Sequence, residues 1–181
     1  VGLPFEEQQD LDGLVDFCKR VSEMRRLVSK WPAQVNISVN TMISKPHTPL
    51  QWFGMIDLDR MREKQDYLRS RMKNRNLKIG FHNRLMSFLE GVFARGDRRL
   101  APVIACAFKK GCRFDGWDEH FKFQLWEEAF RECGIDPKEY LRERAVEEIL
   151  PWDFLDVGVS KESLVEEYRE IQDLLPTKLL T

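Results

Sequence analysis

Residues 45–52 form a short segment whose side chains could bind a ligand or transfer a proton. Pro46 and Pro49 restrict its backbone, so polar side chains in this loop lose little conformational entropy when they are held in place. A single loop histidine is more often a surface residue than a catalyst, but this one follows a strand with a polar face. The candidate site-lining residues of this loop are Lys45, His47, Thr48, Gln51 and Trp52.

The densest cluster of charge in the sequence contains Arg95, Arg98 and Arg99. Guanidinium groups at the start of a helix can bind a phosphate or a carboxylate, because they add charged donors to the free N–H groups of the first turn. These three arginines are therefore candidates for anion binding. The competing interpretation is that they pair with acidic neighbours such as Glu90, and the sequence leaves both open.

Residues 111–121 mix aromatic side chains with Asp, His and Cys. A zinc site built from Cys112, His120 and Cys133 is the least favoured hypothesis, because these residues lack a second close-spaced ligand pair. The sequence also contains no phosphate-binding glycine motif and no nucleophile elbow. We therefore predict no metal site, and three residues of this segment are lower-ranked site candidates: Asp115, Trp117 and His120.

The spacing of apolar residues predicts strands and helices that would position these candidates. A period of two predicts a strand over residues 35–43, and residues 77–81 indicate a second. Asp57, Ser160 and the Asp136-Pro137 pair are expected helix starts. Apolar spacing of three and four predicts helices over residues 7–29, 58–72, 83–94, 97–111, 117–133 and 160–175, with a further helix after Pro137.

Strands alternate with helices in the first part of the chain, and helices alone follow, which predicts an α/β, predominantly helical protein with parallel strands. Functional loops follow the carboxyl ends of parallel strands, so Gly2, Pro4, Glu6 and Asn40 join the candidate site. Two or three strands cannot close a barrel, and no initiator methionine precedes Val1. We therefore expect this chain to be the later part of a larger polypeptide.

Charge and hydropathy limit the classes of function. The formal net charge is −1, from 29 basic and 30 acidic residues, which argues against a general affinity for nucleic acid or anionic membranes. No apolar run approaches the roughly 20 residues of a membrane span, so we expect a soluble protein. The four cysteines are scattered, which is typical of free thiols in the cytoplasm. They are Cys18, Cys106, Cys112 and Cys133.

Five blocks of sequence, taken together and in order, resemble a family of large bacterial radical SAM proteins with a cobalamin-binding-like N-terminal region. The blocks are residues 2–4, 45–52, 90–99, 111–120 and 150–153. The resemblance implies that residues 1–82 are the C-terminal portion of a partial (β/α)6 radical SAM barrel. It also implies that residues 83–181 are a family-specific helical extension. The loop of residues 45–52 would then cover the barrel mouth, where S-adenosylmethionine and substrate meet.

The same resemblance implies that the parent protein uses a four-iron four-sulfur cluster and S-adenosylmethionine, and it leaves cobalamin open. The CxxxCxxC loop that holds such a cluster is missing, because none of the four cysteines has that spacing. We therefore expect this chain to hold no cofactor and to be inactive alone. Its partner would be the missing N-terminal part of the parent, with self-association through an exposed sheet edge as a further expectation. The alternative function is a helical interaction module that docks a protein or RNA partner.

Overall fold

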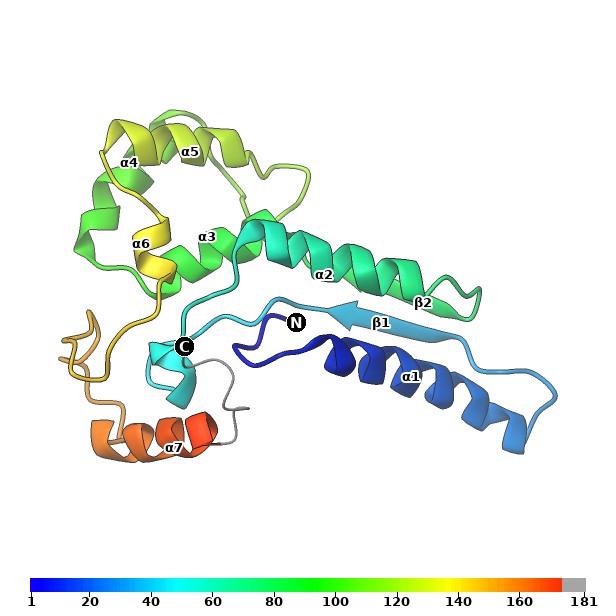
Figure 1. The fold of residues 1–181 in the computed structure, drawn as a ribbon. Helices are drawn as coiled ribbons and strands as arrows, with labels where there is room; N and C mark the ends of the chain where they lie inside the picture. The colour runs from blue at the N-terminus through cyan, green and yellow to red at the C-terminus, as the bar shows by residue number, and fades with distance from the viewer. Residues whose placement is uncertain (174–181) are drawn as a thin grey trace. The chain divides into compact units, whose positions relative to one another are not determined.

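The computed structural model describes residues 1–173, and these divide into two compact units (Figure 1). Unit 1 comprises Val1–Met42 and Ile56–Arg84, and unit 2 comprises Ile43–Met55 and the chain from Leu85 onward. The chain therefore passes from unit 1 to unit 2 at residue 43, returns to unit 1 at residue 56, and enters unit 2 again at residue 85. That loop contains residues 45–52, so unit 2 holds the candidate loop.

Unit 1 is built on a two-stranded parallel sheet in which Val35 lies opposite Leu77. Both strand predictions are confirmed, although the first strand ends at Val39 and not at Ile43. The elements of this unit are α1 (Gln8–Met24), η1 (Arg25–Leu27), β1 (Val35–Val39), α2 (Leu58–Arg71) and β2 (Leu77–Phe81).

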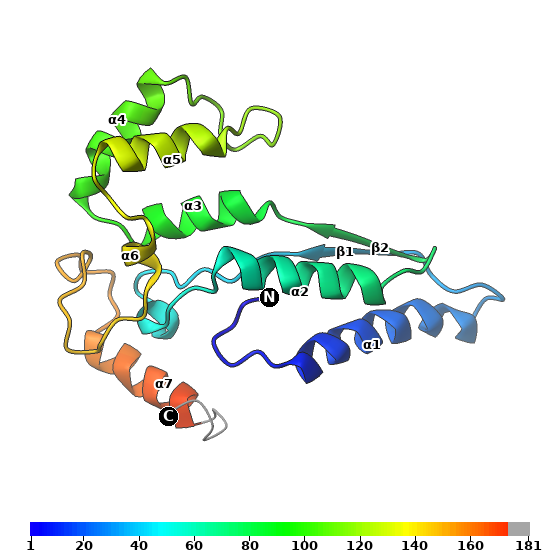
Figure 2. The same cartoon turned by 45° about the horizontal axis from the view of Figure 1, so that its top comes forward.

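The core of unit 1 lies on one face of this sheet, where α1 and α2 cover it (Figure 2). Leu11 and Val15 of α1 and Leu68 of α2 pack with Val39 and Leu77 of the strands. The alternate residues of β1, Asn36 and Ser38, form the opposite, exposed face, and Asn40 is exposed directly after the strand. The polar side of this strand is therefore exposed, as the period of two requires when one face is buried.

The predicted partial (β/α)6 radical SAM barrel is wrong. Residues 1–173 contain two short strands in one sheet, and residues 2–4 do not form a strand. The Val1 amine donates to the Asn40 carbonyl (2.8 Å) and the Met42 N–H donates to the Val1 carbonyl (2.7 Å). Val1 thus makes two hydrogen bonds to the residues that follow β1. Period-two alternation identifies individual strands but does not determine how many join a sheet, and the barrel was inferred from the family resemblance.

Unit 2 consists of short helices and the segment Ile43–Met55, which contains the candidate loop. Its elements are η2 (Pro49–Trp52), α3 (Arg84–Ala94), η3 (Arg98–Leu100), α4 (Ala101–Lys109), α5 (Phe123–Glu132), α6 (Lys138–Leu141) and α7 (Lys161–Asp173). Two expected caps are confirmed, because Asp57 at the start of α2 in unit 1 accepts from the N–H of Arg60 (2.8 Å) and Ser160 accepts from that of Ser163 (3.1 Å). The third helix start is one residue late, since Pro137 and not Asp136 is the cap residue of α6. The expected end of the last helix near Leu175 lies outside the described residues.

One helix prediction is wrong at its start. The apolar spacing placed a helix over residues 117–133, but α5 begins at Phe123 and residues 115–120 form turns and a bend. Trp117 fits a helical stripe by spacing, yet it is 61% exposed. The stripe therefore has no surface to pack against at this point.

Aromatic side chains form much of the core of unit 2. The Tyr168 ring of α7 lies 5.1 Å from the Trp52 ring and 4.9 Å from the Phe53 ring, centroid to centroid. Leu150 and Trp152 complete this cluster. Tilted ring pairs at this separation are favourable beyond the area they bury, so α7 is anchored to η2. No helix among residues 1–173 has both the length and the apolar composition that crossing a membrane requires.

Candidate functional site

The loop of residues 45–52 is held by its own polar side chains. The Gln51 amide oxygen accepts from the His47 N–H (3.0 Å) and from the Trp152 indole N–H (2.7 Å). The Thr48 hydroxyl donates to the Lys45 carbonyl (2.8 Å). Gln51 and Trp52 are buried, so these two candidates hold the loop in shape and lie beneath its surface. His47 has a φ of 56°, a left-handed conformation that the surrounding hydrogen bonds maintain.

Arg95 is the group that fastens this loop to the rest of unit 2. Its side chain is completely buried, with an exposure of 0%. The guanidinium donates five hydrogen bonds, all to backbone carbonyls, of 2.8 to 3.3 Å. The accepting residues are Ser44, Gln51, Phe53, Tyr140 and Arg142. The planar fork of an arginine suits this arrangement, because its donors diverge within one plane.

Burial is also the main electrostatic effect on Arg95. Burial, with the nearby cations Arg144 and Arg142, lowers the pKa of Arg95 to about 10, while Glu148 opposes the shift. The side chain is therefore charged at neutral pH. No carboxylate within the described part of the chain forms an ion pair with Arg95. The carbonyl dipoles of the loop and of α6 stabilise this cation instead.

Backbone hydrogen bonds join the loop to residues 141–144. The Met55 N–H donates to the Leu141 carbonyl and the Arg144 N–H donates to the Trp52 carbonyl, both at 2.8 Å. Gly54 lies between them, and a Cβ atom there would be 3.0 Å from the Glu143 nitrogen. Only glycine allows this approach without displacing the neighbouring backbone. The loop and residues 141–144 therefore form one tightly packed structure around Arg95.

The other predicted arginines have different surroundings. Arg99 is held by Asp97, whose carboxylate accepts from Nη2 (2.7 Å) and Nε (3.0 Å). The hydrogen bonds from the Arg99 side chain are the main cause that lowers the pKa of the Asp97 carboxyl. Arg98 is exposed and lines a cleft beside Phe154. Glu90, the predicted acidic neighbour, pairs with Lys45 at 2.5 Å. The three arginines thus do not form one anion site.

The remaining candidates lie apart from this arrangement. Gly2 and Glu6 belong to unit 1, where the Glu6 carboxylate accepts from the Gly2 N–H (3.0 Å) and the Lys64 ammonium (2.5 Å). Pro4 is partly buried in the same turn and Asn40 is exposed at the end of β1. The lower-ranked candidates occupy the turns before α5, namely Asp115, Trp117 and His120. Among residues 1–173, no group of three or more His, Cys, Asp or Glu side chains could hold a metal ion.

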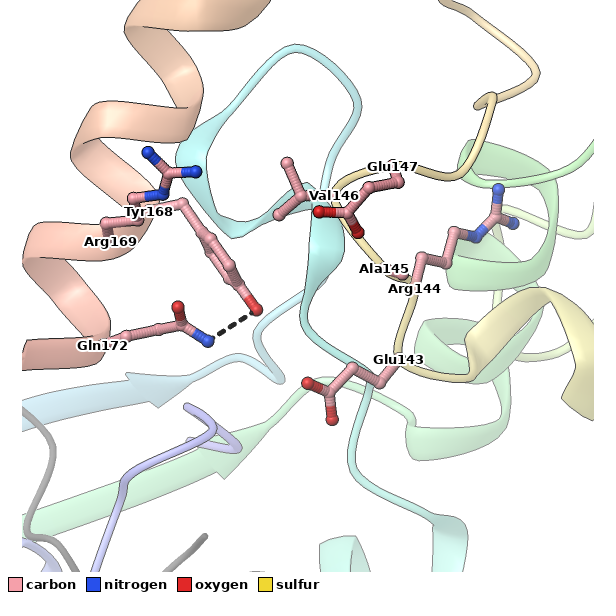
Figure 3. Close-up of a pocket in the computed structure, with 8 residues that line it drawn as sticks. All are labelled: Glu143, Arg144, Ala145, Val146, Glu147, Tyr168, Arg169 and Gln172. Carbon is pink, nitrogen blue, oxygen red and sulfur yellow. Dashed lines mark hydrogen bonds between the residues drawn. The ribbon is translucent and has the colours of Figure 1, made fainter.

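Two pockets of unit 2 involve Arg144, which the sequence analysis did not single out. The first, of about 490 Å³, lies between residues 143–147 and helix α7 (Figure 3). There the Gln172 amide donates to the Tyr168 hydroxyl (2.9 Å). Burial, followed by the nearby Glu143, raises the pKa of this phenol. Arg144 extends away from Tyr168 and Gln172 in this view (Figure 3).

The second pocket, of about 330 Å³, is called here the arginine pocket. Three arginines and three carboxylates line it: Arg99, Arg142, Arg144, Asp97, Glu139 and Glu148. Arg142 donates two hydrogen bonds to Glu148, of 2.9 and 2.6 Å. Arg142 is the main cause that lowers the pKa of Glu148. The only trace of this pocket in the sequence is the Arg142-x-Arg144 pair before Glu148. Charged residues at such spacing usually indicate an exposed surface, so the pair did not stand out.

Comparison with known proteins provides one relative of undetermined function. Over 104 residues, the chain is 30% identical to an uncharacterized protein of Methanocaldococcus jannaschii. The match covers 58% of this chain and 21% of that protein, so the chain spans about a fifth of the length of its relative. No family model matches the sequence. No solved structure matches it either.

Proposed function

We propose that this chain is part of a longer radical SAM protein and that it is catalytically inert by itself. The observation that carries the proposal is the set of five sequence blocks, in order, that resemble that family. It is supported by a relative in which the matched segment is 21% of the whole protein. The cluster-binding CxxxCxxC loop would belong to another part of the longer protein.

The cysteines of this chain do not fit an iron–sulfur cluster. Cluster ligands are thiolates that converge on one site. Burial raises the pKa of the Cys18 and Cys112 thiols. A hydrogen bond to Glu132, with burial, raises that of Cys106. Cys18 also belongs to unit 1, whereas the other three belong to unit 2. The Cys18, Cys106 and Cys112 thiols are therefore protonated at neutral pH, and no catalytic step is assigned to any cysteine of this chain.

Cleavage of S-adenosylmethionine tests the proposal. Under anaerobic, reducing conditions, we expect cleavage by a longer polypeptide that contains both this chain and a CxxxCxxC loop. Replacement of the three loop cysteines by alanine is the matched control and should abolish the reaction, because the cluster supplies the electron. This chain alone should show none. Cleavage by the chain alone, or equal cleavage by the cysteine-free control, would contradict the proposal.

A further inference from the structure

Arg144 is a buried cation without a carboxylate partner. Its exposure is 6%. Its Nη2 donates to the Arg95 carbonyl (2.9 Å), and its Nε is buried with no acceptor. Its guanidinium carbon lies 5.1 Å from the centre of the Trp152 ring. Across residues 1–173, no acidic side chain comes within the 4.0 Å of an ion pair with it. Buried charges are ordinarily paired, so Arg144 has the charge and a free donor with which to bind an anion.

The other arginines of the arginine pocket already have anionic partners. Arg99 is bound by Asp97 and Arg142 by Glu148, each through at least two hydrogen bonds. Arg95, whose carbonyl accepts from Arg144, is a second buried cation and has five carbonyl acceptors. Glu139 approaches only Arg142, with 3.9 Å between its carboxylate and Nε. Arg144 is therefore the arginine of this pocket that no carboxylate binds directly, and burial lowers its pKa while the nearby Glu148 opposes the shift.

Tyr140 also lines the pocket, and burial, followed by the nearby Asp97, raises the pKa of its phenol. Its hydroxyl is already hydrogen-bonded to Asp97. The donors left for a ligand are therefore those of the arginines, and guanidinium groups are common ligands of phosphate and carboxylate groups. A volume of about 330 Å³ suits a small molecule better than a polymer.

We propose that the arginine pocket binds the phosphate or carboxylate group of a small molecule, with Arg144 as its principal ligand. The Asp97 and Glu148 carboxylates set the selectivity of the pocket. Arg99 and Arg142 bind these carboxylates and so reduce their repulsion of an anion, and the bound group contacts Arg144 directly. This inference concerns unit 2 alone and is independent of the radical SAM proposal.

The test is an NMR titration of the whole chain at low ionic strength, with inorganic phosphate in one arm and succinate in the other. The Nε–H resonance of Arg144 reports directly on the buried group. We expect saturable shifts centred on this resonance and on residues 139–151, in one or both arms. Saturation in the phosphate arm alone identifies a phosphate ligand, and saturation in the succinate arm alone identifies a carboxylate.

Arg144→Gln should weaken the binding at least about tenfold, since it removes a charge-assisted hydrogen bond. Arg98→Gln is the matched control, because it removes the same charge from an exposed residue of the neighbouring cleft. It should leave the affinity within about twofold, since exposed charges at a distance are screened. If Arg144→Gln does not fold, the titration of the unsubstituted chain still tests the inference, because the shifts must centre on the Arg144 Nε–H and on residues 139–151.

Three results would overturn the inference. The first is the absence of saturable shifts up to roughly 50 mM of either anion, well beyond the range of specific binding. The second is a set of shifts spread over exposed lysines with Arg144 unaffected. The third is an equal loss of affinity in the Arg98→Gln control, which would reveal a general charge effect.

Discussion

Replacement of Arg95 by alanine should destabilise unit 2 by at least about 3 kcal/mol, because it leaves buried carbonyls without a donor. Five carbonyls from residues 44–53 and 140–142 depend on this guanidinium. A domain is typically stable by about 5–15 kcal/mol, so the change removes a large fraction of that stability. Urea unfolding followed by tryptophan fluorescence measures it.

Two further substitutions separate the hydrogen bonds of Arg95 from its volume and its charge. Arg95→Met keeps most of the apolar stem and should be nearly as destabilising as alanine, since it also lacks donors. Arg98→Ala removes an exposed arginine three residues along the chain and should change the unfolding free energy by no more than about 0.5 kcal/mol. An Arg95→Met protein as stable as the unsubstituted chain would show that the loop does not need this arginine.

Trp52→Ala should cost about 3–5 kcal/mol and release α7 from unit 2. Trp52 is fully buried and its ring contacts Tyr168 of α7, with 5.1 Å between ring centroids. Loss of the indole leaves a cavity on the side of η2 that α7 covers. We therefore expect amide hydrogen exchange to accelerate in Lys161–Asp173 more than in α3. Mass spectrometry of exchanged peptides measures this difference.

Trp117→Ala provides the control for Trp52→Ala. The same residue type is removed there, but its side chain is 61% exposed, so stability should change by no more than about 0.5 kcal/mol. Unchanged exchange in α7 after Trp52→Ala would show that the ring cluster does not hold this helix. A global loss of protection in unit 2, equal in every helix, would show that Trp52 supports the whole unit and not α7 in particular.

The elements that sequence patterns predict best are those in which one face is buried. The alternation around Ile37 and the helical spacing around Leu68 both arise because those side chains enter the core of unit 1. Caps such as Asp57 and Ser160 were predictable because their side chains bond the next turn. The turns around Trp117 were mistaken for helix, since spacing alone does not tell whether an apolar side chain finds a surface to cover.

The site was harder to predict because its contacts are long-range. Gln51 and Trp152 meet through a hydrogen bond across 101 positions of the chain. Arg95 reaches the Tyr140 carbonyl across 45. Nothing in a local pattern distinguishes a buried arginine that binds carbonyls from an exposed one, so Arg95 and Arg98 looked alike. Arg144 was missed for the same reason. In the loop of residues 45–52, the Thr48 and Gln51 side chains bind backbone groups of the loop itself, and Gln51 also binds Trp152.

Iron content after anaerobic reconstitution of this chain with iron and sulfide tests the central claim most directly. We predict well below one iron per chain and no absorbance near roughly 400 nm, because the CxxxCxxC spacing of cluster ligands is missing and no three metal-ligating side chains come together among residues 1–173. Reconstitution of a protein with an intact CxxxCxxC loop, under the same conditions, is the positive control. About four irons per chain with matching sulfide would contradict the account, since Cys18, Cys106, Cys112 and Cys133 would then have to meet at one cluster.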